Sequence, residues 1–122
     1  MANTFKSVSQ VMPASAGTFE TLYTCPPSPA TTTVVIGLMI ANEHTSQITY
    51  SIKHVSTTSA SGNGRESNNQ TTFLQKDIPL AVGETKQALV GGKHVMNQGD
   101  LISVDASVAD KVSVTMSIME IT

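Results

Sequence analysis

The stretch LVGGKHVMNQGDLISVD, residues 89–105, gathers residue types that bind phosphates or metals: paired glycines, a lysine, a histidine and acids. A phosphate-binding loop needs the spacing GxxxxGK, then Ser or Thr, and a helix whose N-terminus meets the phosphate. Here His94 and a valine follow Lys93, and NQGD then marks a turn before another alternating segment. The stretch therefore predicts two turns around a short strand, with Gly99 at positive φ. Lys93 and His94 are interpreted as ordinary strand residues.

The three histidines, His44, His54 and His94, lie far apart and match no HxH, HxxxH or HExxH spacing. Such short spacings place zinc ligands on one face of one element. No DxDxDG loop indicates a calcium site. His54 shares the strand face of Ile52, and we expect it to be half-buried and bonded to a hydroxyl or backbone group. No metal and no cofactor are predicted.

The sequence also contains no recognisable motif for nucleophilic or acid–base catalysis. Cys25 is the single cysteine, which excludes a disulfide within the chain, and it stands beside two prolines with no basic residue nearby to activate it. We interpret it as a small buried residue ending a strand. GxSxG is absent. Asp100 and Asp105 are five apart, which places them on opposite faces of a strand, and they are interpreted as a turn residue and a solvated strand residue. The chain is predicted not to be an enzyme.

The bulk composition excludes further classes of function. The 122 residues suit one domain, 13% of them are charged, the net charge is -2, and only five are aromatic. A nucleic-acid partner needs a basic face or stacking aromatics, and the seven basic residues are scattered. No apolar run is long enough to span a bilayer, and no secretory signal opens the sequence. We expect a chain made in a cytosol, with the NQT sequon at Asn69 unused.

Alternation of apolar and polar residues with period two dominates the chain, and no segment has a capped helical stripe. Turn signals rich in Gly, Pro, Asn and Asp separate the alternating segments. The expected strands cover residues 4–11, 19–24, 33–40, 48–53, 71–76, 86–90, 94–96, 101–106 and 112–121. Eight to nine short strands in one domain, residues 1–122, predict an all-β fold: an antiparallel, jelly-roll-like β-sandwich.

Two segments stand outside this pattern. Residues 56–70 are polar and predict a long exposed loop. Residues 1–29 fit either an N-terminal arm that reaches a neighbouring subunit or local edge strands. An arm would make the first dozen residues dispensable for folding but needed for attachment to a partner. The residues expected to contact partners are Asn3, Thr4, Phe5, Lys6, Asn63, Arg65, Glu66 and Asn68.

Six strings in the sequence match a group of small phage proteins. They are MANTFK at the start, LYTCP, TTVVIGLMIAN, FLQKDIPLAVG, GGKHVMNQGDLISVDAS and the terminal VSVTMSIMEIT. Together they cover most of the chain except residues 56–70, and with them the chain resembles small virion proteins of tailed bacteriophages that infect marine bacteria and cyanobacteria.

The resemblance implies a non-enzymatic virion component, assembled in the host cytoplasm, with no catalytic residues to carry over. Head decoration is the first expectation: a cement protein that binds the major capsid protein, favoured as a homotrimer. A place in the neck, tail or baseplate, bound to other virion proteins, is the alternative. A receptor- or carbohydrate-binding sandwich is a third hypothesis, which the scarcity of aromatic residues disfavours.

Overall fold

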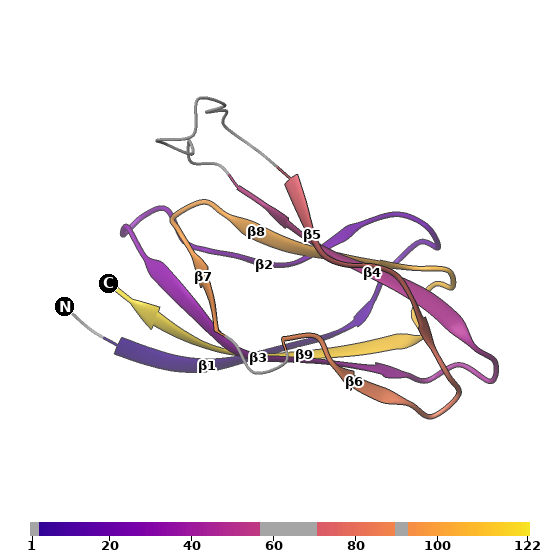
Figure 1. Cartoon of the computed structure of the whole chain (residues 1–122). Helices are drawn as coiled ribbons and strands as arrows, with labels where there is room; N and C mark the ends of the chain where they lie inside the picture. The colour runs from indigo at the N-terminus through magenta and orange to yellow at the C-terminus, as the bar shows by residue number, and fades with distance from the viewer. Residues whose placement is uncertain (1–2, 57–70, 90–92) are drawn as a thin grey trace.

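The computed structural model describes residues 3–56, 71–89 and 93–122, which form antiparallel strands in two stacked layers (Figure 1). The strands are β1 (Asn3–Met12), β2 (Glu20–Thr24), β3 (Thr32–Asn42), β4 (Ile48–Val55), β5 (Thr71–Leu80), β6 (Thr85–Gln87), β7 (His94–Met96), β8 (Leu101–Ala106) and β9 (Val112–Ile121). No helix in this part of the chain is long and apolar enough to cross a membrane.

The strands divide into two sheets. The first, here called the β1 sheet, has the order β1-β9-β3-β6, and β7 also pairs with β3. The second, the β2 sheet, has the order β2-β8-β4-β5. The first strand therefore lies beside the last, and the chain passes repeatedly between the layers, as it does in a jelly roll built from two Greek keys. The predicted all-β, jelly-roll-like sandwich is confirmed.

The core lies between the sheets and follows the alternation of the sequence. On β9 the side chains of Val112, Val114, Met116 and Ile118 point inward and are at most 1% exposed. On β3 the period breaks, because a bulge between Val35 and Gly37 adds one residue. Val35 and Leu38, three apart, therefore both reach the core. Burying these aliphatic side chains supplies the main stabilisation of the sandwich.

Positive-φ residues set several turns and one bulge. Gly99 has φ 83° in the turn before β8, as the sequence predicts. β5 runs beyond the expected residues 71–76 to Leu80, since its register against β4 shifts and Asp77 adopts φ 49°. β6 ends at Gln87, earlier than the expected residue 90. The observed strands otherwise follow the expected ones closely.

The N-terminal segment is a strand of the sheet. β1 pairs with β9 over its whole length, from Asn3 opposite Ile121 to Met12 opposite Val112, with no shift of register. Met12 is completely buried. Of the two alternatives for residues 1–29, the described part fits local edge strands, and the arm hypothesis is wrong for β1. The predicted loop, residues 56–70, lies outside the described residues except for Ser56.

A candidate protein-binding face on the β1 sheet

The outward positions of β1, β9 and β3 hold no charged residue, and the Glu43 carboxylate, just beyond the end of β3, accepts a hydrogen bond from the Ser113 hydroxyl at one end of this surface. The register and the burial pattern fix which positions point away from the core. They are Asn3, Phe5, Ser7, Ser9 and Val11 on β1, Ser113, Thr115, Ser117, Met119 and Ile121 on β9, and Thr32, Val34, Ile36, Gly37, Met39 and Ala41 on β3. We call this surface the uncharged face.

Exposed apolar side chains concentrate on the β1 sheet. Of seven large hydrophobic residues that are exposed in the described chain, four lie on the uncharged face, and Val95 of β7 lies opposite Val34 at its border. Phe5 is 73% exposed, and Val11, Ile36 and Met39 are each more than 40% exposed. Apolar residues set among small hydroxyls, without charges, are typical of the centre of a protein–protein interface.

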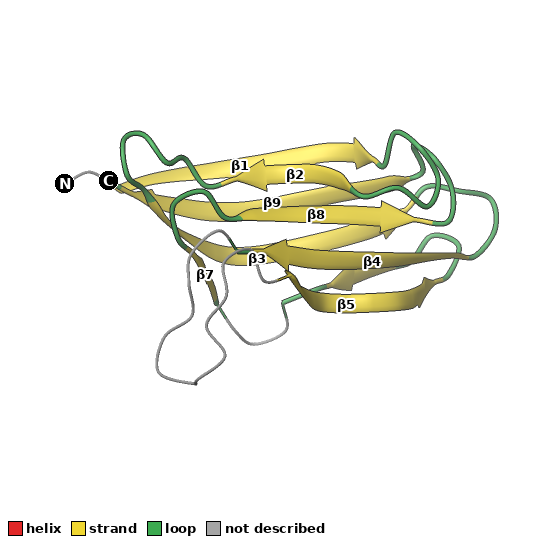
Figure 2. Ribbon diagram, turned by 90° about the horizontal axis from the view of Figure 1, so that it is seen from above, coloured by secondary structure: helices red, strands yellow, loops and turns green. Residues whose placement is uncertain are grey.

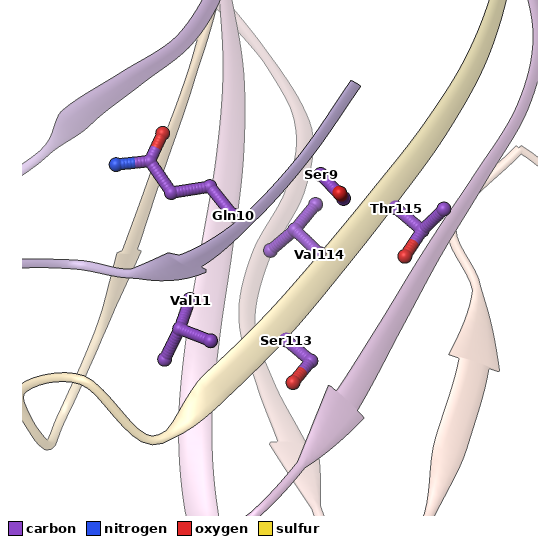
Figure 3. A pocket seen from close by; sticks show the side chains of 6 residues that line it. All are labelled: Ser9, Gln10, Val11, Ser113, Val114 and Thr115. Carbon is purple, nitrogen blue, oxygen red and sulfur yellow. The ribbon is translucent and has the colours of Figure 1, made fainter. Parts of the chain in front are cut away.

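The uncharged face is shallow. A depression of ≈ 430 Å³ lies where β1 meets β9 (Figure 3). Its lining comes from two neighbouring strands: Ser9, Gln10, Val11, Ser113, Val114 and Thr115. These residues include no aromatic ring and no ionisable group, whereas small-molecule sites are concave and rich in aromatic residues. The depression suits an inserted side chain of another protein better than a cofactor.

The outer surface of the β2 sheet is built differently. The Phe19 and Phe73 rings lie 6.1 Å apart, and the Lys53 ammonium lies 4.1 Å from the centre of the Phe19 ring. On the same sheet the Asp77 backbone N–H donates to the Ser51 hydroxyl at 2.9 Å. Burial, with the nearby charge of Asp77, raises the pKa of the Asp105 carboxyl. This face is occupied by contacts among its own side chains.

Four of the predicted contact residues lie on β1, and they divide between its two sides. Phe5 and Asn3 belong to the uncharged face. Thr4 and Lys6 point to the other side of the strand, and the Lys6 ammonium lies 2.8 Å from the Glu120 carboxylate. Lys6 thus forms an ion pair within the chain while half of its side chain stays exposed, and its contact with a partner remains a prediction. The other predicted contacts lie outside the described residues: Asn63, Arg65, Glu66 and Asn68.

Glu120 is an inward carboxylate that links both sheets. It accepts hydrogen bonds from the Lys6 ammonium on β1 and from the Tyr23 hydroxyl on β2. These bonds lower the pKa of the Glu120 carboxyl. Burial, together with the bond to Glu120, raises the pKa of the Tyr23 phenol. The Tyr23 hydroxyl also lies 2.8 Å from the Thr33 hydroxyl. The cluster anchors β1 to the rest of the sandwich.

Cys25 is buried directly after β2, as the sequence predicts. Its sulfur lies 3.1 Å from the Thr31 carbonyl oxygen and 3.1 Å from the Thr33 hydroxyl. Burial raises the pKa of the thiol, so the nucleophilic thiolate is disfavoured. The geometry supports the structural interpretation of this residue.

The structure brings together two histidines that lie 40 residues apart. His94 Nε2 lies 2.8 Å from His54 Nδ1, and His54 Nε2 lies 3.2 Å from the Asp100 carboxylate. An ionised carboxylate only accepts, so His54 donates from Nε2 and receives the His94 Nε2–H at Nδ1. His54 lies on β4 and His94 on β7, so this chain of bonds joins the two sheets at one end of the sandwich (Figure 1).

Two sequence-based interpretations, those of His94 and His54, are corrected by these contacts. His94 is an inter-sheet bridge and not an ordinary strand residue, and His54 binds a carboxylate and an imidazole in place of a hydroxyl or backbone group. Asp100 lies in the turn before β8, as the sequence predicts; it is 1% exposed and also accepts a hydrogen bond from the Asn97 backbone N–H at 3.0 Å. The partners in these contacts are 40 and 46 residues apart in the sequence, so rules based on local spacing do not predict them.

The histidine pair and the other described residues do not gather into a set of metal ligands. Among the described residues no three His, Cys, Asp or Glu side chains gather closely enough to hold a metal ion. Both ring nitrogens of His54 are already engaged by hydrogen bonds. Burial, reinforced by the neighbouring His54, lowers the pKa of the His94 imidazole, while Asp100 opposes that shift. Its geometry suits a structural joint between the sheets.

Comparison with known proteins adds little to this geometry. No family model matches the chain, and no curated protein matches it. A solved structure of the pili of Bacillus endospore appendages, described as a novel family of disulfide-linked pili, is similar with a TM-score of 0.48 and 13% sequence identity. The alignment covers 99% of this chain and 87% of the other.

Proposed function

We propose that the chain is a non-enzymatic structural protein of a tailed-phage virion, which works by binding other particle proteins through the uncharged face. A head-decoration role on the outer capsid lattice is the first form of the proposal. The observation that carries the binding role is the exposed outer surface of β1, β9 and β3, whose outward positions hold apolar and small hydroxyl side chains and no charged residue, with Glu43 at one end. The sequence resemblance to small phage virion proteins supports the choice of particle.

The chemistry of the uncharged face suits a permanent contact between proteins. A charge buried at an interface loses its hydration, whereas Ser and Thr hydroxyls lose less and find partners readily. Exposed Phe5, Ile36 and Met39 supply apolar area that a partner would remove from water. From strand spacing and rise, three ten-residue strands present on the order of 500 Å² of flat surface.

A neck, tail or baseplate position uses the same face with a different partner. Both forms need one protein surface bound to another, and the geometry of the uncharged face serves either. They differ in copy number, because a capsid lattice offers many equivalent sites and a neck or tail offers few.

The test is binding of the recombinant chain to emptied or expanded capsids of a phage that encodes it. Head decoration predicts saturation at a stoichiometry set by the lattice, and a higher melting temperature of the decorated capsids. Electron microscopy of the intact virion then locates the chain. Density only at the neck or tail would reject head decoration and leave the structural role. Absence from purified virions would reject the structural role as well.

A further inference from the structure

The free border of β1 is an open strand edge. β1 has ten residues and pairs only with β9 among the strands of the described chain. Its register has no bulge, it contains no proline, and its one charged side chain, Lys6, is paired with Glu120. β1 lies at one border of the sandwich (Figure 2). Backbone N–H and C=O groups along such a border are ready to pair with another strand.

The other borders of the two sheets are protected. β5 carries Pro79, the exposed Lys76, and Asp77 at φ 49° within a shifted register. β2 has five residues and a bulge between Thr21 and Tyr23. β6 and β7 have three residues each. Short strands, bulges, proline and charges are the devices by which sheets avoid pairing with other chains. β1 alone among these borders lacks them.

We propose that β1 pairs antiparallel with β1 of a second copy of this chain across a two-fold axis. Identical strands paired in this way form a self-complementary, closed interface that satisfies the free backbone groups of both copies. Registers that place Lys6 of one copy opposite Lys6 of the other are disfavoured by charge repulsion. Registers centred on the hydroxyl positions Ser7 and Ser9 avoid that repulsion, because these side chains are small and uncharged.

The pairing also explains the composition of the outer surface. A two-fold axis perpendicular to the sheet keeps the outward residues of both copies on the same side, so Phe5 and Val11 of each copy continue one surface. The uncharged faces of the two copies then form one continuous surface with an area on the order of 1,000 Å². A stable interface needs about 800 Å² from each partner. One copy falls short of that area and two copies together reach it.

The contact also extends over the inner side of β1. Thr4, Lys6 and Gln10 point to the inner side of β1 and are nevertheless exposed. A neighbouring β1 would shelter part of these side chains. A single pair of ten-residue strands buries a modest area, so free in solution the dimer should be in reversible equilibrium with the monomer and should tighten on a repeated lattice.

Cysteine cross-linking of the purified chain tests the pairing. Paired strands bring opposite Cα atoms to about 4.5–5.5 Å, within disulfide range. A register centred on Ser7 or on Ser9 should give disulfide-linked dimers of that single variant, Ser7→Cys or Ser9→Cys, under mild oxidation, and a register centred between them should give dimers only when the two variants are mixed. Ser117→Cys is the matched control, since Ser117 lies beside Ser7 on the same face but one strand inside the border. Native Cys25 is fully buried and should form no cross-link.

Sedimentation of the uncross-linked chain supplies the second measurement. The wild-type chain should show a concentration-dependent dimer, and the double variant Ser7→Lys with Ser9→Lys should weaken it about tenfold or more through like charges across the axis. Ser117→Lys should leave it intact. A wild-type chain that is monomeric throughout, a trimer, or preferential cross-linking through Ser117→Cys would overturn the proposal. No capsid is needed, so this result is separate from the test of the virion role.

Discussion

The two outer faces of the sandwich differ in how their exposed apolar side chains are covered. On the β2 sheet, Lys53 lies over the Phe19 ring, and Phe19 contacts Phe73, so charged and aromatic side chains cover one another. On the β1 sheet, Phe5 and Met39 stand exposed among serines and threonines with no long charged side chain to cover them. Long lysine side chains are the usual means of covering apolar surface while keeping a charge in water.

The difference indicates which face is complete within one chain. On the β2 face the aromatic and charged side chains contact one another, Phe73 is still 46% exposed, and Ser51 and Ser103 are only 4% exposed. The β1 face leaves apolar area in water and meets the open border of β1. Such a difference between the faces is expected when one face remains in contact with water and the other is covered by another protein.

The largest expected effect concerns the strand that borders the uncharged face. Met12 and Phe5 lie on opposite sides of β1, Met12 fully buried and Phe5 73% exposed. Met12→Ala should lower the free energy of unfolding by about 2–5 kcal/mol because it opens a cavity in the core. Phe5→Ala should change it by less than about 0.5 kcal/mol. Urea unfolding of the two variants measures both values.

Deletion of residues 1–12 extends the same test. It removes Met12 from the core and uncovers the whole edge of β9, so we expect loss of cooperative unfolding. A truncated chain that unfolds at the wild-type urea midpoint would restore the hypothesis of a dispensable arm and contradict the placement of β1.

A matched pair of threonines compares the faces directly. Thr115 is exposed on β9 of the uncharged face, and Thr49 is exposed on β4 of the β2 sheet. Thr115→Glu should weaken binding to capsids by on the order of 2 kcal/mol, about thirtyfold, because the carboxylate would be buried without a partner. Thr49→Glu should leave binding unchanged. Equal losses of affinity, or a larger loss for Thr49→Glu, would contradict binding through the uncharged face. Titration calorimetry or pelleting with capsids measures both affinities.

The sequence alone predicts most of the strands, because half-buried strands reveal themselves locally. Val112, Val114 and Met116 alternate with Ser and Thr, and the structure places them in the core of β9. The turn at Gly99 follows from the need for positive φ. The bulge after Val35 was not predictable, since one inserted residue reverses the inward and outward positions without changing the composition.

The uncharged face was only partly predictable. The low charged fraction of 13% indicated contact with other protein surfaces. That the uncharged positions of β1, β9 and β3 lie side by side depends on strand order, which links the two ends of the chain. The outward set of each strand lacks charge in the sequence itself, so strand order was the missing information.

The smallest predicted effect concerns the joint that holds the two sheets at one end, and it depends on pH. Burial and the neighbouring His54 lower the pKa of His94 in the folded chain, with Asp100 opposing. The unfolded chain therefore takes up this proton first as the pH falls below about 6.5. The stabilisation is complete above that pH and is lost as the pH falls towards the lower pKa of the folded state, by at most about 1.4 kcal/mol per pH unit for one proton.

Urea unfolding between about pH 5 and 8 measures this dependence. His94→Gln should flatten the decline that begins below about pH 6.5, whatever its effect on stability at neutral pH. His44→Gln should retain the decline, since His44 lies in the turn between β3 and β4, away from the pair. The lowered pKa of Glu120 acts in a separate, more acidic range, below the ordinary carboxyl pKa. A His94→Gln chain with the wild-type slope would show that the inter-sheet bond between His54 and His94 does not couple folding to protonation.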